Sequence, residues 1–194
     1  MASIEELRDT RIKKIELLEK QAEKRLETAK EFAKEGNNEE VKNQIQDYND
    51  TKEKQGGLLD KIENPRQSLD QVEERTIEQQ KTMEEIKTNV IDKDVKNEII
   101  EVQEGVVNQV AKRVVDVDGK EGLTDFQNKV EHVWAPGASG KGEGGVIYEG
   151  GSKIMFAPGT SAGSNNAPND IKGVEVKTGG GGGNDGKTPE IKGN

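Results

Sequence analysis

Cysteine is absent from this chain of 194 residues, which excludes disulfides, thiolate metal sites and thiol nucleophiles. Aromatic residues are also scarce, at 3%, and hydrophobic residues amount to only 29%, against roughly 45–50% apolar residues in typical globular domains. A large compact core is therefore not expected, because little apolar surface is present to offset the loss of backbone entropy. The composition favours an elongated helical assembly with a thin apolar seam.

Long apolar runs are missing too. No stretch approaches the ~20 apolar residues that a membrane-spanning helix needs, and the N-terminus lacks the hydrophobic segment of a signal peptide. The sequence predicts a soluble protein that lies in the cytoplasm or in an assembled particle, in preference to classical secretion. It does not decide between these compartments.

Histidine occurs once, as His132, and it has no second histidine or cysteine with which to hold a metal ion. The residue types needed for a Ser/His/Asp arrangement cannot be brought together from any recognisable motif. We therefore predict no catalytic residue, no cofactor and no enzymatic activity.

Charged residues make up 35% of the chain, and the net charge is -9. The six acidic residues and six lysines that follow Val133 cancel, so the whole negative excess lies in the part before it. An acidic rod repels phosphate groups. Nucleic acid is therefore not an expected partner, and a protein is.

Helix start and stop signals divide the first two thirds of the chain. Ser3 and Glu6 form a capping box, Gly36 suits a helix C-terminus, and Asn64-Pro65 marks a further boundary. Gly56-Gly57 indicates a bend or turn within the second helix. The helical region 3–133 is predicted to contain helices at about 3–35, 38–63, 65–91, 94–115 and 124–133.

The stretch 65–115 has the clearest pattern, since its apolar residues recur at alternating spacings of three and four, as in the a and d positions of a heptad. So narrow a strip needs a partner, and Thr76 and Gln79 within it could fix the register of pairing. The fold class is mostly α, an elongated helical bundle or coiled coil, and we expect self-association into a homo-oligomer or pairing with another helical protein. The predicted partner-binding seam consists of Leu69, Val72, Met83, Ile86, Val90, Val95, Ile99, Val102 and Val106.

Glycine dominates the end of the chain, where 17 of the 23 glycines follow Trp134. Within the glycine-rich region 134–178, residues 146–149 and 152–156 flank Gly150-Gly151 and could form a small β-hairpin, with 174–177 as a third strand. The remainder, 179–194, has the composition of a flexible, disordered tail.

Asp116, Asp118 and Leu123 match positions one, three and eight of an EF-hand calcium loop, which the segment loosely resembles. Glu121 occupies the position of the required glycine, and Gln127 replaces the bidentate glutamate. A loop that joins two helices is the preferred interpretation, and Asp116 and Asp118 stay weak candidates for a metal site.

These patterns support three functional hypotheses. The first is a non-enzymatic structural or interaction protein that acts through coiled-coil helices as an assembly scaffold or tether, of the phage, secretion-apparatus or surface-assembly type. The second is an exported effector or toxin fragment with its activity in the region after Trp134. The third is a degenerate calcium binder of the EF-hand kind.

Overall fold

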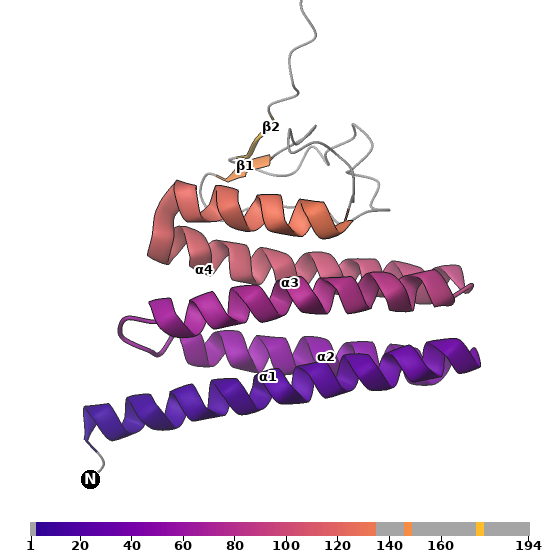
Figure 1. Cartoon of the computed structure of the whole chain (residues 1–194), viewed down its shortest axis with the longest axis horizontal. Coiled ribbons are helices and arrows are strands. Elements are labelled where there is room, and N and C mark those ends of the chain that lie inside the picture. The colour runs from indigo at the N-terminus through magenta and orange to yellow at the C-terminus, as the bar shows by residue number, and fades with distance from the viewer. Residues whose placement is uncertain (1–2, 135–145, 149–173, 177–194) are drawn as a thin grey trace, which may run out of the picture.

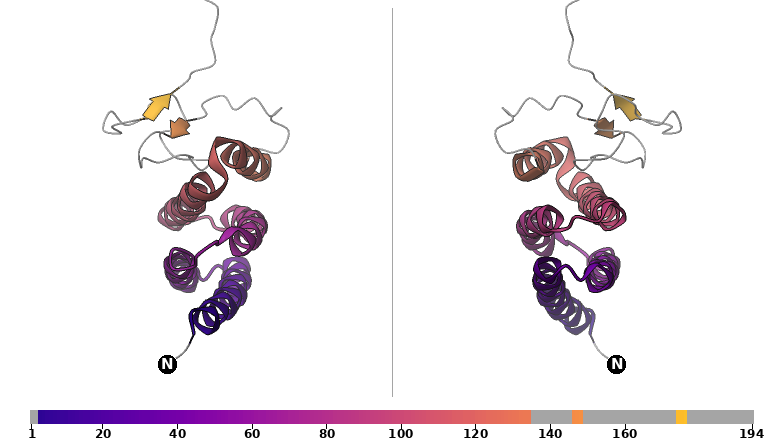
Figure 2. Two further views of the ribbon diagram at one scale, coloured as in Figure 1. Left: turned by 90° about the vertical axis from the view of Figure 1, so that its left-hand side faces the viewer. Right: turned by 90° about the vertical axis from the view of Figure 1, so that its right-hand side faces the viewer.

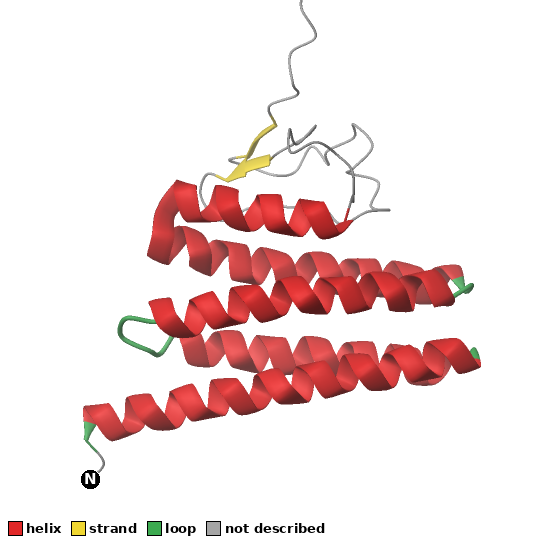
Figure 3. Ribbon diagram, in the orientation of Figure 1, coloured by secondary structure: helices red, strands yellow, loops and turns green. Residues whose placement is uncertain are grey.

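The computed structural model describes residues 3–134, 146–148 and 174–176, and helices make up most of this part of the chain (Figures 1 and 3). The mostly α fold class is confirmed. In chain order the elements are α1 (Ile4–Glu35), α2 (Asn38–Leu59), α3 (Arg66–Asn89), α4 (Lys93–Trp134), β1 (Val146–Tyr148) and β2 (Val174–Val176).

The helix ends follow local side-chain chemistry. The Ser3 hydroxyl accepts from the Glu6 amide at 3.1 Å, and the Glu6 carboxylate accepts from the Ser3 amide at 2.7 Å, so the predicted capping box is present. Gly36 ends α1 in the left-handed conformation with φ 73°, which glycine adopts without strain. Asp92 caps the N-terminus of α4, because its carboxylate accepts hydrogen bonds from the backbone amides of Asp94 and Val95.

The helices form two antiparallel hairpins, α1–α2 and α3–α4, that stack with α1 against α3 and α2 against α4. The end-on views of Figure 2 show this two-layer arrangement as a zigzag. Ion pairs bridge the stacked helices on the surface. They are Lys30–Glu85 and Arg75–Glu23 between α1 and α3, Lys42–Glu98 between α2 and α4, and Arg113–Asp60 between α4 and the residue that follows α2.

Gly56 and Gly57 do not bend the second helix at its middle, because they lie in the last turn of α2, which ends at Leu59. Gly56 is buried, and a β-carbon there would lie 2.6 Å from a guanidinium nitrogen of Arg113. The absence of a side chain lets Arg113 cross α2 and bind Asp60 through two hydrogen bonds of 2.9 Å. Packing thus accounts for this glycine better than a turn does.

The predicted break between two helices in 115–124 is present, but it is shorter than expected: Gly119 alone has non-helical angles (φ 68°, ψ -159°), and it forms a kink inside α4. Residues 120–134, called the C-terminal arm below, fold back over α3 and the first part of α4 (Figures 1 and 2). One residue reverses the helix direction, whereas the sequence pattern suggested a connection of several residues.

Two apolar clusters form the core. The hinge-end cluster lies beside the C-terminal arm, and the turn-end cluster lies beside Gly36 and Val90. The first contains Ile15, Leu59, Ile62, Leu69, Val72, Ile100, Val107, Val110, Ala111, Val114, Leu123, Phe126, Val130 and Trp134. The second contains Ala22, Leu26, Ala29, Ala33, Val41, Ile45, Tyr48, Met83, Ile86, Val90, Val95, Ile99, Val102 and Val106.

The described strands β1 and β2 pair antiparallel, with Ile147 opposite Glu175. The strand predicted at 152–156 and the tail 179–194 lie outside the described residues, as does most of the region after Trp134. None of the described helices is both long enough and apolar enough to cross a membrane.

Candidate functional site

All nine residues of the predicted partner-binding seam are buried in the interior of the single chain. Their exposed fractions range from 0% at Met83 to 8% at Val102. The hinge-end cluster takes two of them and the turn-end cluster takes the other seven. The apolar strip is therefore covered by helices of the same chain, and no second chain is needed to keep it dry.

A layer of polar side chains separates the two apolar clusters. We call it the central polar layer. It lies across the bundle at one height, where each of α1, α2 and α3 carries polar residues between its apolar positions. Its members are Glu19, Tyr48, Lys52, Gln55, Thr76 and Gln79, all exposed by 8% or less.

The Glu19 carboxylate is the hub of the central polar layer. Lys52 Nζ lies 3.1 and 3.3 Å from its two oxygens, and the side-chain amides of Gln55 and Gln79 each donate to one of them. Tyr48 then donates its hydroxyl hydrogen to Gln79 Oε1 at 3.0 Å. One buried charge thus joins α1 to both α2 and α3.

Burial governs the ionisation of this layer. Loss of solvent lowers the pKa of Lys52, and the neighbouring Glu19 carboxylate opposes that shift. Burial raises the pKa of Tyr48 well above its ordinary value, and the same carboxylate adds to the effect. The tyrosine therefore keeps its proton and stays a hydrogen-bond donor across the ordinary pH range.

Thr76 and Gln79 were identified from the sequence as polar positions within the seam, whereas Glu19 was missed. The signal was present: Ile15, Glu19, Ala22, Leu26, Ala29 and Ala33 alternate by four and three, as a heptad does. Glu19 therefore occupies one position of the apolar strip of α1, and this is the signal for a buried acid.

Thr76 is the member of the layer without a polar contact, because its buried hydroxyl has no hydrogen-bond partner among the described residues. We expect Thr76→Val to raise the free energy of unfolding by about 1 kcal/mol, since valine keeps the shape and removes the unsatisfied group. Chemical denaturation measures the change. Thr51→Val is the matched control: Thr51 is also buried but donates to the Asp47 carbonyl at 2.7 Å, so this variant should gain nothing.

An open groove of about 570 Å³ runs between α2 and α4 and is the second candidate site. Its lining carries four carboxylates and several side-chain amides, and it includes no lysine, arginine or histidine. Near its middle, a β-carbon at Gly105 would meet nothing within 4 Å. The lining residues are Gln46, Asn49, Glu53, Asp94, Asn97, Glu98, Glu101, Val102, Gly105 and Gln109.

Comparisons with protein-family models, with curated proteins and with solved structures find no match to this chain. Its function must therefore be inferred from the two sites themselves. The central polar layer is enclosed by helices and acts on their packing. The groove is open and acidic, so a ligand can reach it.

The candidate metal ligands are not brought together. Asp116 is exposed near the end of the straight part of α4, and Asp118 forms an ion pair with Arg66 at 2.5 Å. His132 is exposed on the C-terminal arm. Among the described residues, no group of three or more histidine, cysteine, aspartate or glutamate side chains is placed to hold a metal ion.

Proposed function

We propose that this chain is a non-enzymatic interaction scaffold that holds a basic segment of a protein partner in the groove between α2 and α4. The observation that carries the proposal is the lining of that groove, which holds four carboxylates and no basic residue; of these only Glu98 forms an ion pair within the described residues, with Lys42 beside the groove, so the groove keeps a negative excess. A cationic partner is attracted to such a surface and a polyanion is repelled.

The central polar layer supports the same function by fixing the helices against one another. Glu19 can bind Lys52, Gln55 and Gln79 together only when the three helices pack at one relative height along the bundle axis. The reason is that α2 and α3 each carry one set of donors that matches the carboxylate. Buried polar contacts of this kind can specify pairing register in helical assemblies. The groove then keeps a constant shape, which favours a partner that docks without reorganising the scaffold.

Binding of designed helical peptides tests the proposal. A fluorescent peptide with lysines spaced four residues apart should bind the full chain, and its affinity should fall between 50 and 200 mM salt, as screening weakens contacts between exposed charges. A peptide of the same length with glutamate in place of lysine should not bind. Equal binding of both peptides, or of neither, would refute the basic-segment partner.

Two groove variants locate the binding site. We expect Glu53→Lys combined with Glu101→Lys to weaken the lysine peptide at least tenfold, about 1.4 kcal/mol, because both carboxylates line the groove. Gly105→Leu should also weaken it by filling free space without changing charge. Glu16→Lys with Glu27→Lys is the matched control, since it makes the same charge change on exposed positions of α1.

A further inference from the structure

The C-terminal arm reverses direction at a hinge that depends on two glycines. Gly119 has φ 68°, a conformation that residues with a side chain rarely adopt. At Gly122 a β-carbon would lie 2.5 Å from the β-carbon of Asp118, so the fold-back leaves no room for one. The Arg66 guanidinium also donates to the Val117 carbonyl at 3.3 Å, just before the kink. The hinge is short, and the rest of the arm is regular helix.

The arm is held mainly by apolar contact. Leu123, Phe126, Val130 and Trp134 are buried in the hinge-end cluster with side chains of α3 and of the first part of α4. One buried hydrogen bond completes the contact, from Trp134 Nε1 to Gln80 Oε1 at 3.1 Å. The arm therefore has a defined docking surface that is separate from its covalent attachment at Gly119.

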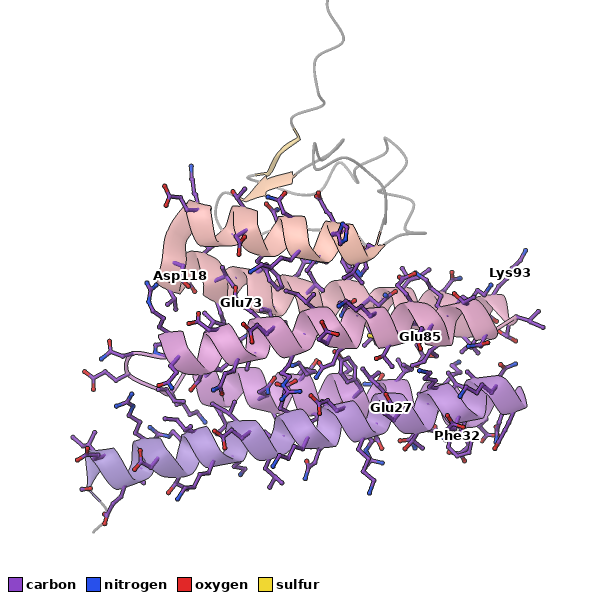
Figure 4. All side chains as sticks on the ribbon, in the orientation of Figure 1. Glu27, Phe32, Glu73, Glu85, Lys93 and Asp118 are labelled. Carbon is purple, nitrogen blue, oxygen red and sulfur yellow. The ribbon has the colours of Figure 1, made fainter. Side chains whose placement is uncertain are left out.

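Negative charge gathers where the arm leaves the hinge. Glu73 of α3 faces Asp70 of its own helix and Asp118, Asp125 and Lys129 of α4, and Glu74 of α3 also lies near Lys129. Figure 4 shows Glu73 and Asp118 at the same end of the stack. Burial, and then the nearby carboxylates, raise the pKa of Glu73 to about 7. Arg66 pairs with Asp118, and Lys129 with Asp125 at 2.6 Å, so both nearby cations are held by other carboxylates.

We propose that the C-terminal arm exchanges between two copies of this chain, opening at Gly119 and docking on α3 and α4 of the second copy to form a swapped dimer. The second copy is the fitting partner because it carries the same docking surface, which the arm already matches in shape and hydrogen bonding. Exchange of an identical element is a low-cost route to dimers, and short hinges favour it.

Straightening the hinge gives the open arm its reach. If residues 117–120 became helical, α4 would be one uninterrupted rod, and its last 15 residues would project ~22 Å beyond the kink at 1.5 Å per residue. The apolar face of the projecting arm and the emptied surface on α3 would both be exposed to water. Two opened copies cover both surfaces by exchanging arms.

Isotope-mixed cross-linking tests the exchange. Chains labelled with nitrogen-14 and nitrogen-15 are mixed at high concentration and treated with a carbodiimide, which joins Lys129 of the arm to Glu73 or Glu74 of α3. We expect cross-linked peptide pairs that carry both isotopes, in a species with the mass of a dimer. Pairs of a single isotope only, at every concentration, would overturn the proposal.

Gly119→Ala sharpens the test. Alanine disfavours the positive-φ, extended-ψ conformation of Gly119, so each closed hinge loses about tenfold in population and the dimer association constant should rise about a hundredfold. Gly57→Ala is the control, because Gly57 is helical with nothing within 4 Å of an added β-carbon, and it should leave the monomer–dimer balance unchanged. A monomeric Gly119→Ala variant, or a dimer without mixed cross-links, would contradict the exchange.

The pH dependence of exchange provides a second, independent readout on the unmodified hinge. In the closed form Glu73 holds its proton up to about pH 7, whereas an opened arm restores its ordinary pKa of 4.5. Opening therefore releases a proton and is favoured as pH rises from 4.5 to 7, levelling off above that. Mixed-isotope pairs should form faster after incubation at pH 8 than at pH 5. Glu73→Gln should reduce the difference, and Glu73→Gln combined with Glu131→Gln should abolish it, because burial also raises the pKa of Glu131 on the arm. Equal rates in the unmodified chain would overturn the proposed opening.

Discussion

Lys52→Met is expected to lower the free energy of unfolding by about 3–5 kcal/mol, the largest loss we predict for a single substitution in the chain. Methionine fills a similar volume but leaves the Glu19 carboxylate buried without its cation. The two glutamine amides still donate to that carboxylate, yet they carry no charge to neutralise it. An uncompensated buried charge costs more than the intact pair contributes.

Urea denaturation at neutral pH measures this loss. Lys54→Met is the matched control: Lys54 is exposed on the same helix, and its replacement should change stability by less than about 0.5 kcal/mol. Equal losses for Lys52→Met and Lys54→Met would mean that the ion pair does not stabilise the bundle.

Replacement of the five hydrogen-bonded members of the central polar layer by apolar residues should have the opposite effect on stability. A buried ion pair exchanged for well-packed apolar side chains is often neutral or stabilising by ~1–4 kcal/mol, because the desolvation cost disappears with the charges. Because all the hydrogen-bonded side chains are replaced together, none of their donors or acceptors is left buried without a partner. The substitutions are Glu19→Leu, Tyr48→Phe, Lys52→Met, Gln55→Leu and Gln79→Met.

The same variant should lose its unique helix register, since a continuous apolar seam allows the helices to pack at more than one relative height. Its backbone amide spectrum is expected to broaden while its denaturation midpoint stays equal or rises. Thr76→Val, which keeps the ion pair, serves as the reference. A variant that is stable and also retains a single sharp spectrum would show that packing alone specifies the register.

The sequence predicted the helices well because their signals are local. The capping box at Ser3, the left-handed C-terminus at Gly36 and the boundary at Asn64-Pro65 all depend on neighbouring residues, and the structure has helix ends at or close to each. The heptad spacing of α3 also identified buried positions correctly. The spacing could not specify the molecule that buries them.

The remaining features depend on residues far apart in the chain. Glu19 and Lys52 meet only when α1 packs against α2, so neither residue alone indicates a buried pair. The groove is formed by two helices joined through an entire intervening helix, and its acidic character emerges only from their side-by-side placement. Gly119 was interpreted as part of a loop because a single glycine does not indicate whether the helix resumes at the next residue.

The position of the central polar layer restricts how the length of this chain can vary. Insertion of one residue into α1 between Ile15 and Ala22 would rotate everything beyond it by ~100°. Such a change would move the carboxylate away from the lysine and both amides at once. Related sequences should therefore accommodate length differences in the connections around residues 36 and 60–65, while the spacing within each helix stays constant.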